Sequence, residues 1–273
     1  MSNKVVSNCA VIIPIHKENL SVDEEKSLRQ CFNILGGYPI IFISPRGLNC
    51  EKYKSVYNEY ETFVNYEFFD KKFFADVNAY SALMVSYKFY ERFLNYEYIL
   101  IYQLDAFVFE NNLTFWCELD YDYIGGPVFE LRRGANAPEH TIFLNGGFSL
   151  RKTKVFYKIA KTKLRFNVFV YLLLSKYDIL FRKQTIFNLL KLVVLFLLTR
   201  FLYKFFKLEV NEDFEWSLKI RKFGNIAPFD KALRFSFDSC PEYAFKLNNN
   251  SLPLGCHGWT SYYNRLFWKE FVT

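Results

Sequence analysis

The first hundred residues alternate apolar, β-branched runs with polar or amphipathic segments, and this alternation constrains the fold more than any other feature of the chain. It predicts strands at residues 5–15, 39–45, 62–69 and 98–104, and helices at 21–35, 51–60 and 78–94. Apolar strands that are separated by helices are typical of a parallel sheet covered on both faces. The sequence therefore predicts an α/β fold with a mostly parallel, Rossmann-like sheet flanked by helices.

The best-marked boundary in this half is the start of the first helix. Ser21 is followed three residues later by Glu24, which is the spacing of a capping box. Gly36 and Gly37 follow the last apolar residue of the pattern. We expect the helix to begin just after Ser21 and to end at Gly36.

Charge is distributed unevenly along the chain. Residues 151–207 carry 14 Lys and Arg against a single acid, Asp178, whereas residues 1–150 carry 13 basic and 19 acidic residues. The basic residues of 161–207 lie among Leu, Phe and Val, and the longest uncharged stretch there, 166–175, is too short to span a bilayer. We interpret 161–207 as a basic, apolar helical insertion that binds an anionic membrane surface; a pair of buried helices is the alternative.

The composition excludes several classes of protein. With 51% hydrophobic residues, including 32 Phe and 20 Tyr, the chain must fold or meet a membrane. Basic residues among apolar neighbours do not resemble a nucleic-acid-binding surface, so no nucleic-acid partner is expected. The N-terminus shows no secretion signal, and the six cysteines are scattered without a Cys-x-x-Cys pair. We expect reduced thiols in a cytoplasmic protein that is peripheral on the inner face of the membrane.

Four segments carry residue types that are suited to chemistry. Asp105 ends an apolar strand, where a carboxylate is costly to bury unless a cation meets it. The pair Gly146-Gly147 lets the backbone approach a ligand closely. Glu212 and Asp213 begin a predicted helix, and His257 lies in a glycine-flanked segment. Each also has an ordinary structural interpretation as a cap, a turn, a helix-dipole partner or a buried histidine.

In their order along the chain, these segments resemble a known family. The motifs are Tyr98-x-Leu-x-Tyr-Gln-Leu-Asp105, Tyr121-Asp-Tyr-Ile-Gly-Gly-Pro127, Asn145-Gly-Gly-Phe-Ser-Leu-Arg151, Glu212-Asp213 and Cys256-His-Gly-Trp259. Together they resemble a bacterial and fungal family of glycosyltransferase-like proteins, a domain of unknown function, that is related to GT-A nucleotide-sugar transferases. Enzymes of the fringe and β-1,3-galactosyltransferase kind are similar more distantly. The resemblance covers nearly the whole chain outside 161–207.

The resemblance implies a GT-A-like fold and an activity. The expected reaction moves a sugar from a nucleotide-diphosphate donor to a glycan or lipid-linked acceptor in surface polysaccharide assembly, with inversion and with Mn²⁺ or Mg²⁺ as cofactor. Residues 1–160 would form the nucleotide-sugar-binding half. Residues 208–273 would form the acceptor and catalytic part of the same domain, after the insertion at 161–207.

The resemblance also assigns roles to residues. Asp105 matches the last Asp of the Asp-x-Asp motif that holds the metal, Gln103 replaces the first Asp of that motif, and His257 matches a C-terminal metal ligand. Of the acidic pair, Asp213 is favoured as the general base and Glu212 is the second choice. The expected donor-binding residues are Pro14, His16, Lys17, Asn78, Tyr80, Gln103 and Asp105. The residues expected near the donor sugar and acceptor are Asn145, Gly146, Gly147 and Trp259.

Two other functions remain open at this point. The loss of one acid at Gln103 is compatible with a non-catalytic GT-A relative that binds nucleotide sugar or lipid. A hydrolase that uses the same acids is less favoured, because hydrolases seldom need a nucleotide-binding βαβ half.

Overall fold

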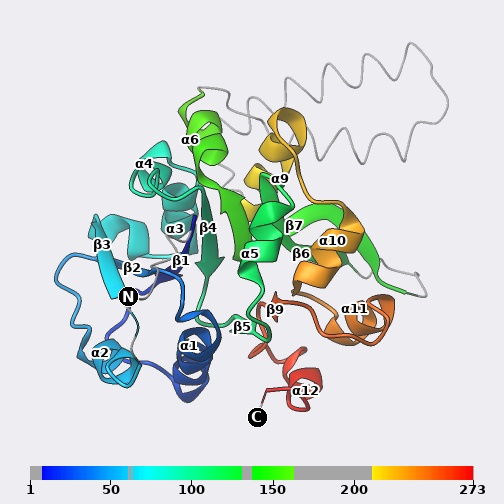
Figure 1. Ribbon diagram of the computed structural model, residues 1–273, viewed down its shortest axis with the longest axis horizontal. Helices are drawn as coiled ribbons and strands as arrows, with labels where there is room; N and C mark the ends of the chain where they lie inside the picture. Colours follow the sequence, from blue (N-terminus) through cyan, green and yellow to red (C-terminus); the bar gives the residue numbers. More distant parts are fainter. Residues whose placement is uncertain (1–7, 61, 63, 131–136, 163–210, 273) are drawn as a thin grey trace, which may run out of the picture.

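The computed structural model describes residues 8–60, 62, 64–130, 137–162 and 211–272. Its centre is a six-stranded sheet in the order β3-β2-β1-β4-β7-β6, with helices on both faces (Figure 1). These strands are β1 (Cys9–Pro14), β2 (Ile40–Pro45), β3 (Val64–Phe69), β4 (Tyr98–Tyr102), β6 (Tyr123–Glu130) and β7 (Glu139–Lys152). A second, three-stranded sheet consists of β5 (Phe107–Val108), β9 (Gly255–Cys256) and β8 (Ser236–Phe237), in that order.

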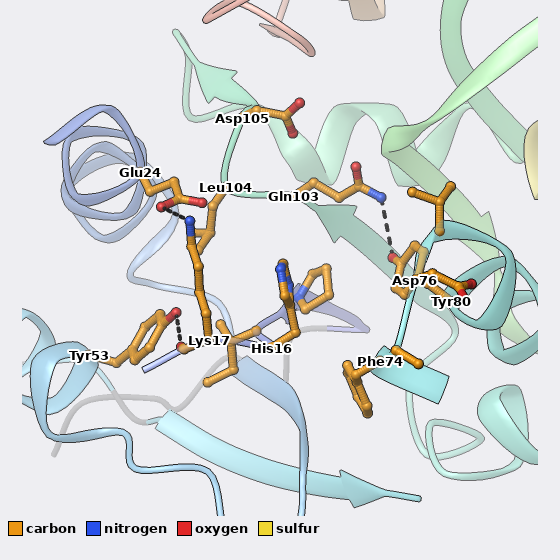
Figure 2. Close-up of a pocket in the computed structure, with 14 residues that line it drawn as sticks. His16, Lys17, Glu24, Tyr53, Phe74, Asp76, Tyr80, Gln103, Leu104 and Asp105 are labelled. Carbon is orange, nitrogen blue, oxygen red and sulfur yellow. Dashed lines mark hydrogen bonds and ion pairs between the residues drawn. The ribbon is translucent and has the colours of Figure 1, made fainter. Parts of the chain in front are cut away.

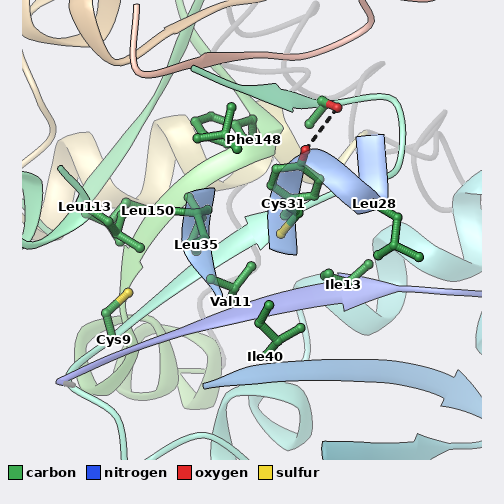
Figure 3. Close-up of a cluster of buried hydrophobic side chains, with 14 of the residues drawn as sticks. Cys9, Val11, Ile13, Leu28, Cys31, Leu35, Ile40, Leu113, Phe148 and Leu150 are labelled. Carbon is green, nitrogen blue, oxygen red and sulfur yellow. Dashed lines mark hydrogen bonds between the residues drawn. The ribbon is translucent and has the colours of Figure 1, made fainter. Parts of the chain in front are cut away.

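Two separate groups of helices cover the two faces of the large sheet. Figure 3 shows part of the first face, where α1 (Val22–Leu35), α2 (Glu51–Tyr57) and α5 (Leu113–Glu118) bury their apolar sides. On the second face lie α3 (Val77–Met84), α4 (Tyr87–Glu91), α6 (Thr153–Lys161) and α9 (Glu212–Phe223). The remaining helices are η1 (Lys71–Phe74), α10 (Phe229–Phe235), α11 (Pro241–Leu247) and α12 (Arg265–Trp268).

The mainly parallel sheet confirms the predicted fold class. Strands β3, β2, β1 and β4 are parallel to one another, whereas β7 runs antiparallel to both β4 and β6. Strands β1, β2 and β4 are buried on both faces, which explains why their sequences are mostly apolar rather than alternating. The predicted capping box is also present: Ser21 accepts from the backbone of Glu24, whose carboxylate accepts from the backbone of Ser21.

Three features of the fold differ from the sequence predictions or add to them. The helix predicted at 78–94 is two helices, because Ser86 leaves the helical conformation and its hydroxyl caps α4 by accepting from the backbone of Lys88. The antiparallel β6 and β7 and the small second sheet were not predicted. The insertion at 161–207 lies outside the described residues except for its first two, so its predicted helices and membrane contact stay predictions.

Two global expectations concern thiols and membranes. All six cysteines lie in the described part of the chain and none forms a disulfide; four of them are buried. None of the helices in the described ranges is both long and apolar enough to cross a membrane.

The topology brings three strand ends together. Parallel β1 and β4 are neighbours, so their carboxyl ends open at the same edge of the sheet. The small sheet extends this edge, because Phe107, which follows β4, pairs with Cys256 of β9. His257 is therefore placed beside the segment that follows β4, although about 150 residues separate them.

Candidate functional site

A cavity of about 480 Å³ lies at the carboxyl ends of β1 and β4 (Figure 2). The size is within the range of pockets that bind small molecules. It is lined by Pro14, Ile15, His16, Lys17, Glu24, Tyr53, Phe74, Ala75, Asp76, Val77, Tyr80, Gln103, Leu104 and Asp105. The first strand, α1, α3 and the turn after β4 each supply part of the wall, as expected for a ligand site of an open α/β sheet.

The cavity wall carries little free positive charge. Among the described lining residues only His16 and Lys17 can be cationic, and the ammonium of Lys17 is 2.7 Å from the carboxylate of Glu24. The hydroxyl of Tyr53 donates to the carbonyl of Lys17 and fixes the backbone there. A diphosphate bound in this cavity would need a further cation to balance its charge.

A cluster of four side chains lies at the end of the cavity near Asp105. Nε2 of His257 is 3.0 Å from Oε1 of Gln103 and 3.2 Å from Oδ1 of Asp105. Nδ1 of His257 is 2.9 Å from Oδ1 of Asp238, so the imidazole is held between two carboxylates. We call Gln103, Asp105, Asp238 and His257 the histidine cluster.

The two carboxylates and the imidazole change one another's protonation. Burial would raise the pKa of Asp105, but the charge and hydrogen bond of His257 outweigh burial and lower it. Burial would lower the pKa of His257, but Asp105 and Asp238 together raise it well above its ordinary value. The imidazole itself supplies positive charge to the two carboxylates that it contacts.

A second cluster contains the acidic pair and a buried arginine. Nη2 of Arg151 donates to Oε1 of Glu212 over 2.9 Å, and both side chains are at most 5% exposed. Asp213, the next residue, has its pKa raised well above the ordinary value by burial and by the negative charge of Glu212. We call Arg151, Glu212 and Asp213 the acidic cluster.

The backbone of Gly146 and Gly147 lies between the two clusters. A Cβ atom at Gly146 would be 2.2 Å from Oδ1 of Asp213, and one at Gly147 would be 2.1 Å from Nε2 of His257. Tyr80 is close to both clusters: its hydroxyl accepts from Gln103, and, after burial, the charge of Glu212 contributes most to its raised pKa. The glycine pair predicted from sequence is therefore the surface that the two clusters share.

The structure places most of the predicted donor-binding residues around the cavity. Six of the seven line it, and their binding of a nucleotide stays a prediction. Asn78 does not line it; this side chain is exposed on the first turn of α3, where the N-terminal cap is Asp76. The hypothesis that Asn78 contacts the base or ribose has no support from the cavity.

Two residues predicted near the sugar, Asn145 and Trp259, have contacts within the fold, and their roles toward a sugar stay predictions. Oδ1 of Asn145 accepts from the backbone of Gly147 over 2.7 Å, which shapes the glycine pair itself. Trp259 is 5% exposed and packs against Phe107, so its ring belongs to an aromatic core. Neither side chain presents an open face for a sugar to stack on.

Sequence reasoning missed two residues of these clusters. Asp238 directly follows the short strand β8, just as Asp105 follows the apolar run 98–104. An acid directly after a strand was the sequence signal that could have identified it. Arg151 ends the quoted glycine motif, but nothing in its sequence context pairs it with a residue 61 positions away. Only the fold brings these partners together.

The histidine cluster holds nitrogen and oxygen donors of the kinds that divalent metals take, but its His and Asp side chains alone do not make a metal site. Among the described residues, no group of three or more His, Cys, Asp and Glu side chains could hold a metal ion. The amide oxygen of Gln103 adds a further donor. Oε1 of Gln103 lies 3.0 Å from Nε2 of His257, and Oδ1 of Asp105 lies 3.2 Å from the same nitrogen. Adjacent ligands of an octahedral ion with bonds of about 2.1 Å are about 3 Å apart. Once Nε2 has lost its proton, the bond from Nδ1 to Asp238 would leave Nε2 available to coordinate, as in carboxylate–histidine–metal sites.

Comparison with solved structures identifies the fold as that of GT-A glycosyltransferases. Xyloside xylosyltransferase 1 from mouse, in its apo form, has a TM-score of 0.51 at 13% identity over 91% of this chain and 97% of that one. Glycosyltransferase GlyE from Streptococcus pneumoniae TIGR4, also apo, has a TM-score of 0.50 at 12% identity over 96% of this chain and 59% of that one. Identities this low show the fold and leave the activity to other evidence.

The chain belongs to the family described as protein of unknown function (DUF5672), whose family model matches residues 63–257. Core-mannan synthase A from Aspergillus fumigatus, in a form with Mn and GDP, is similar over 48% of this chain and 45% of that one, at 16% identity and a TM-score of 0.39. This chain thus spans less than half of that synthase. A comparison with curated proteins gives no match.

The contact of Gly147 with His257 predicts a cost for any side chain at this position. We expect Gly147→Ala to lower the free energy of unfolding by about 1–3 kcal/mol, because overpacking a filled site costs that much. Denaturant unfolding measures the change. Gly37→Ala is the control, since a Cβ there meets nothing within 4 Å. Equal stabilities for both variants would contradict the close approach.

Proposed function

We propose that this protein is a metal-assisted glycosyltransferase that moves a sugar from a nucleotide-diphosphate donor to a glycan or lipid-linked acceptor. One observation carries the proposal. Gly147 lies against His257 of the histidine cluster, whose nitrogen and oxygen atoms are of the kinds that bind a metal, and Gly146 lies against Asp213, whose carboxylate is suited to act as a base. Gln103 and Asp105 of the histidine cluster line the cavity at the carboxyl ends of β1 and β4, where an open α/β sheet binds its ligands. The GT-A fold supports the same class of activity.

The histidine cluster acts on the donor side. Gln103, Asp105 and His257 would hold Mn²⁺ or Mg²⁺, which supplies positive charge for the departing nucleoside diphosphate. Asp238 orients the imidazole through Nδ1. His16 and Lys17 line the same cavity, so they would lie beside the bound nucleotide.

The acidic cluster acts on the acceptor side. The raised pKa of Asp213 gives its carboxylate the proton affinity that a general base needs, once it is deprotonated. Glu212 is a poorer candidate, because Arg151 already occupies its Oε1. Asp213 and the histidine cluster contact different glycines of the pair, so a base and a leaving group on opposite sides of the reacting carbon fit this arrangement. This supports an inverting reaction, which the anomeric configuration of the product tests.

A screen of nucleotide sugars tests the proposal as a whole. UDP-glucose, UDP-galactose, UDP-N-acetylglucosamine and GDP-mannose are each added with and without Mn²⁺, and thermal unfolding and release of nucleoside diphosphate are measured. A ligand that binds the folded state raises the unfolding temperature. We expect one donor to do so more strongly with Mn²⁺ and to be turned over. Stabilisation without turnover would favour the non-catalytic relative instead.

The proposed metal ligands Gln103, Asp105 and His257, here called the metal set, predict opposite effects on nucleotide binding for two substitutions. Asp105→Asn removes the carboxylate from this set and should weaken Mn²⁺-dependent binding of nucleoside diphosphate at least about tenfold, since it removes a charged ligand. Gln103→Glu adds a carboxylate and should tighten the same binding. Calorimetry with Mn²⁺ and UDP or GDP measures both changes. Unchanged affinity in both variants would remove these residues from the metal set.

The base assignment predicts a loss of turnover with donor affinity preserved. Asp213→Asn should lower kcat about 10²-fold, the usual contribution of a general base. Asp230→Asn, at another helix start outside both clusters, is the control. Glu212→Gln removes the negative charge that raises the pKa of Asp213. Activity needs deprotonated Asp213, so the acid limb of the pH profile should move to lower pH. A limb that stays in place would show that Asp213 is not the titrating base.

We also propose that the insertion at 161–207 binds an anionic membrane surface, which would place the protein on the inner face of the membrane, near a lipid-linked acceptor in polysaccharide assembly. The support is its sequence: basic residues within an apolar segment. Each basic residue near such a surface contributes about 1 kcal/mol.

The membrane proposal predicts binding that depends on charge. The protein should sediment with phosphatidylserine vesicles more than with phosphatidylcholine vesicles, and added salt should release part of it. Arg182→Gln with Lys183→Gln should weaken binding about 30-fold, which corresponds to about 2 kcal/mol. The same change at Lys71 and Lys72, outside the insertion, is the control. Equal binding to both vesicle types would contradict the proposal.

A further inference from the structure

The guanidinium of Arg151 is the most fully connected buried charge among the described residues of the site. Its Nη2 donates to Glu212 over 2.9 Å and to the carbonyl of Gly146 over 3.1 Å. Its Nη1 donates to the hydroxyl of Tyr90 over 2.9 Å, and its Nε donates to the hydroxyl of Ser149 over 3.0 Å. The side chain has no exposed surface, so each of these contacts replaces water.

These contacts join two elements that are distant in sequence. Gly146 and Ser149 belong to β7, and the hydroxyl of Ser149 also donates to the carbonyl of Gly146 over 2.7 Å. Glu212 is the first residue of α9. The guanidinium therefore holds the first turn of α9 against the glycine pair. A lysine could keep the charge but not this planar set of donors.

The acidic cluster contains one cation for two carboxylates. Arg151 pairs with Glu212 directly, and the second oxygen of Glu212 is buried with no hydrogen-bond partner among the described residues. Within the described ranges Asp213 forms no ion pair of its own, although the charges of Arg151 and His257 act on it, and its Oδ1 lies against Gly146. The two acids thus differ in their contacts. Glu212 fixes the start of α9 through Arg151, whereas Asp213 faces the glycine pair and has a raised pKa.

We infer that Arg151 is a positioning residue, which acts through Glu212 and the carbonyl of Gly146 to hold Asp213 where it can accept the acceptor's proton. This inference rests on the proposed glycosyl transfer. It assigns Glu212 to positioning as well, rather than to proton transfer.

The test separates positioning from folding. Removing one partner of a buried ion pair strands the other charge, whereas removing both charges is often tolerated. The main variant is therefore Arg151→Met with Glu212→Gln, and Arg151→Lys, which keeps the charge, is the second. The control is Lys219→Met with Glu215→Gln, which removes a neighbouring ion pair on the same helix.

The measurements are thermal unfolding, affinity for UDP or GDP with Mn²⁺, and release of nucleoside diphosphate from the donor found in the screen. We expect cooperative unfolding, unchanged nucleotide affinity and a kcat about 10²-fold lower in both Arg151 variants, because small displacements of a catalytic group cost that much. The control pair should keep the wild-type kcat.

Each outcome decides a different point. Wild-type kcat in either folded Arg151 variant would overturn the positioning role while leaving glycosyl transfer in place. A loss of nucleotide affinity equal to the loss of kcat would also overturn it, since the role would then be structural. A wild-type protein that releases nucleoside diphosphate from no donor would remove the proposed function and this inference together.

Discussion

The site depends on a stretch of backbone that lies too close to its neighbours for any side chain. At Gly146 and Gly147 a Cβ atom would fall within 2.2 Å of a carboxylate oxygen or an imidazole nitrogen. Glycine alone permits this approach. Because β7 passes through at this distance, the histidine cluster and the acidic cluster can share one short surface.

Charge explains how these groups coexist in a largely buried place. His257 balances Asp105 and Asp238, and Arg151 balances Glu212, so each cluster carries its own cation. The cavity has little positive charge left over for a diphosphate, since Lys17 is paired with Glu24. A divalent ion bound by the histidine cluster would supply that charge. The metal-assisted reaction proposed above would use both the electrostatics of the cavity and the donors of the histidine cluster.

Local sequence was enough to predict the elements whose signals lie within a few residues. The capping box at Ser21 and the apolar runs of β1, β2 and β4 were predicted and are present, since capping and burial on both faces leave direct marks on the sequence. The break at Ser86 was missed, because a serine inside an amphipathic pattern caps a new helix only when packing separates the two segments. The antiparallel β6 and β7 were missed because glycines interrupt their strand pattern.

The sequence by itself determined the parallel α/β core, the residue types of the site and, through a resemblance of ordered motifs, the class of chemistry to expect. Tertiary structure decided which of those residues meet. It brought His257 to Gln103 and Asp105, added Asp238, paired Glu212 with Arg151 and left Asp213 at Gly146, while it placed Asn78 outside the cavity. Apart from the contact of His257 with Asp238, 19 positions away, the contacts that assemble the clusters join residues 61 or more positions apart. Periodicity and spacing describe only near neighbours, so the physical cause of the site lies in the packing of strands and helices that no local pattern records.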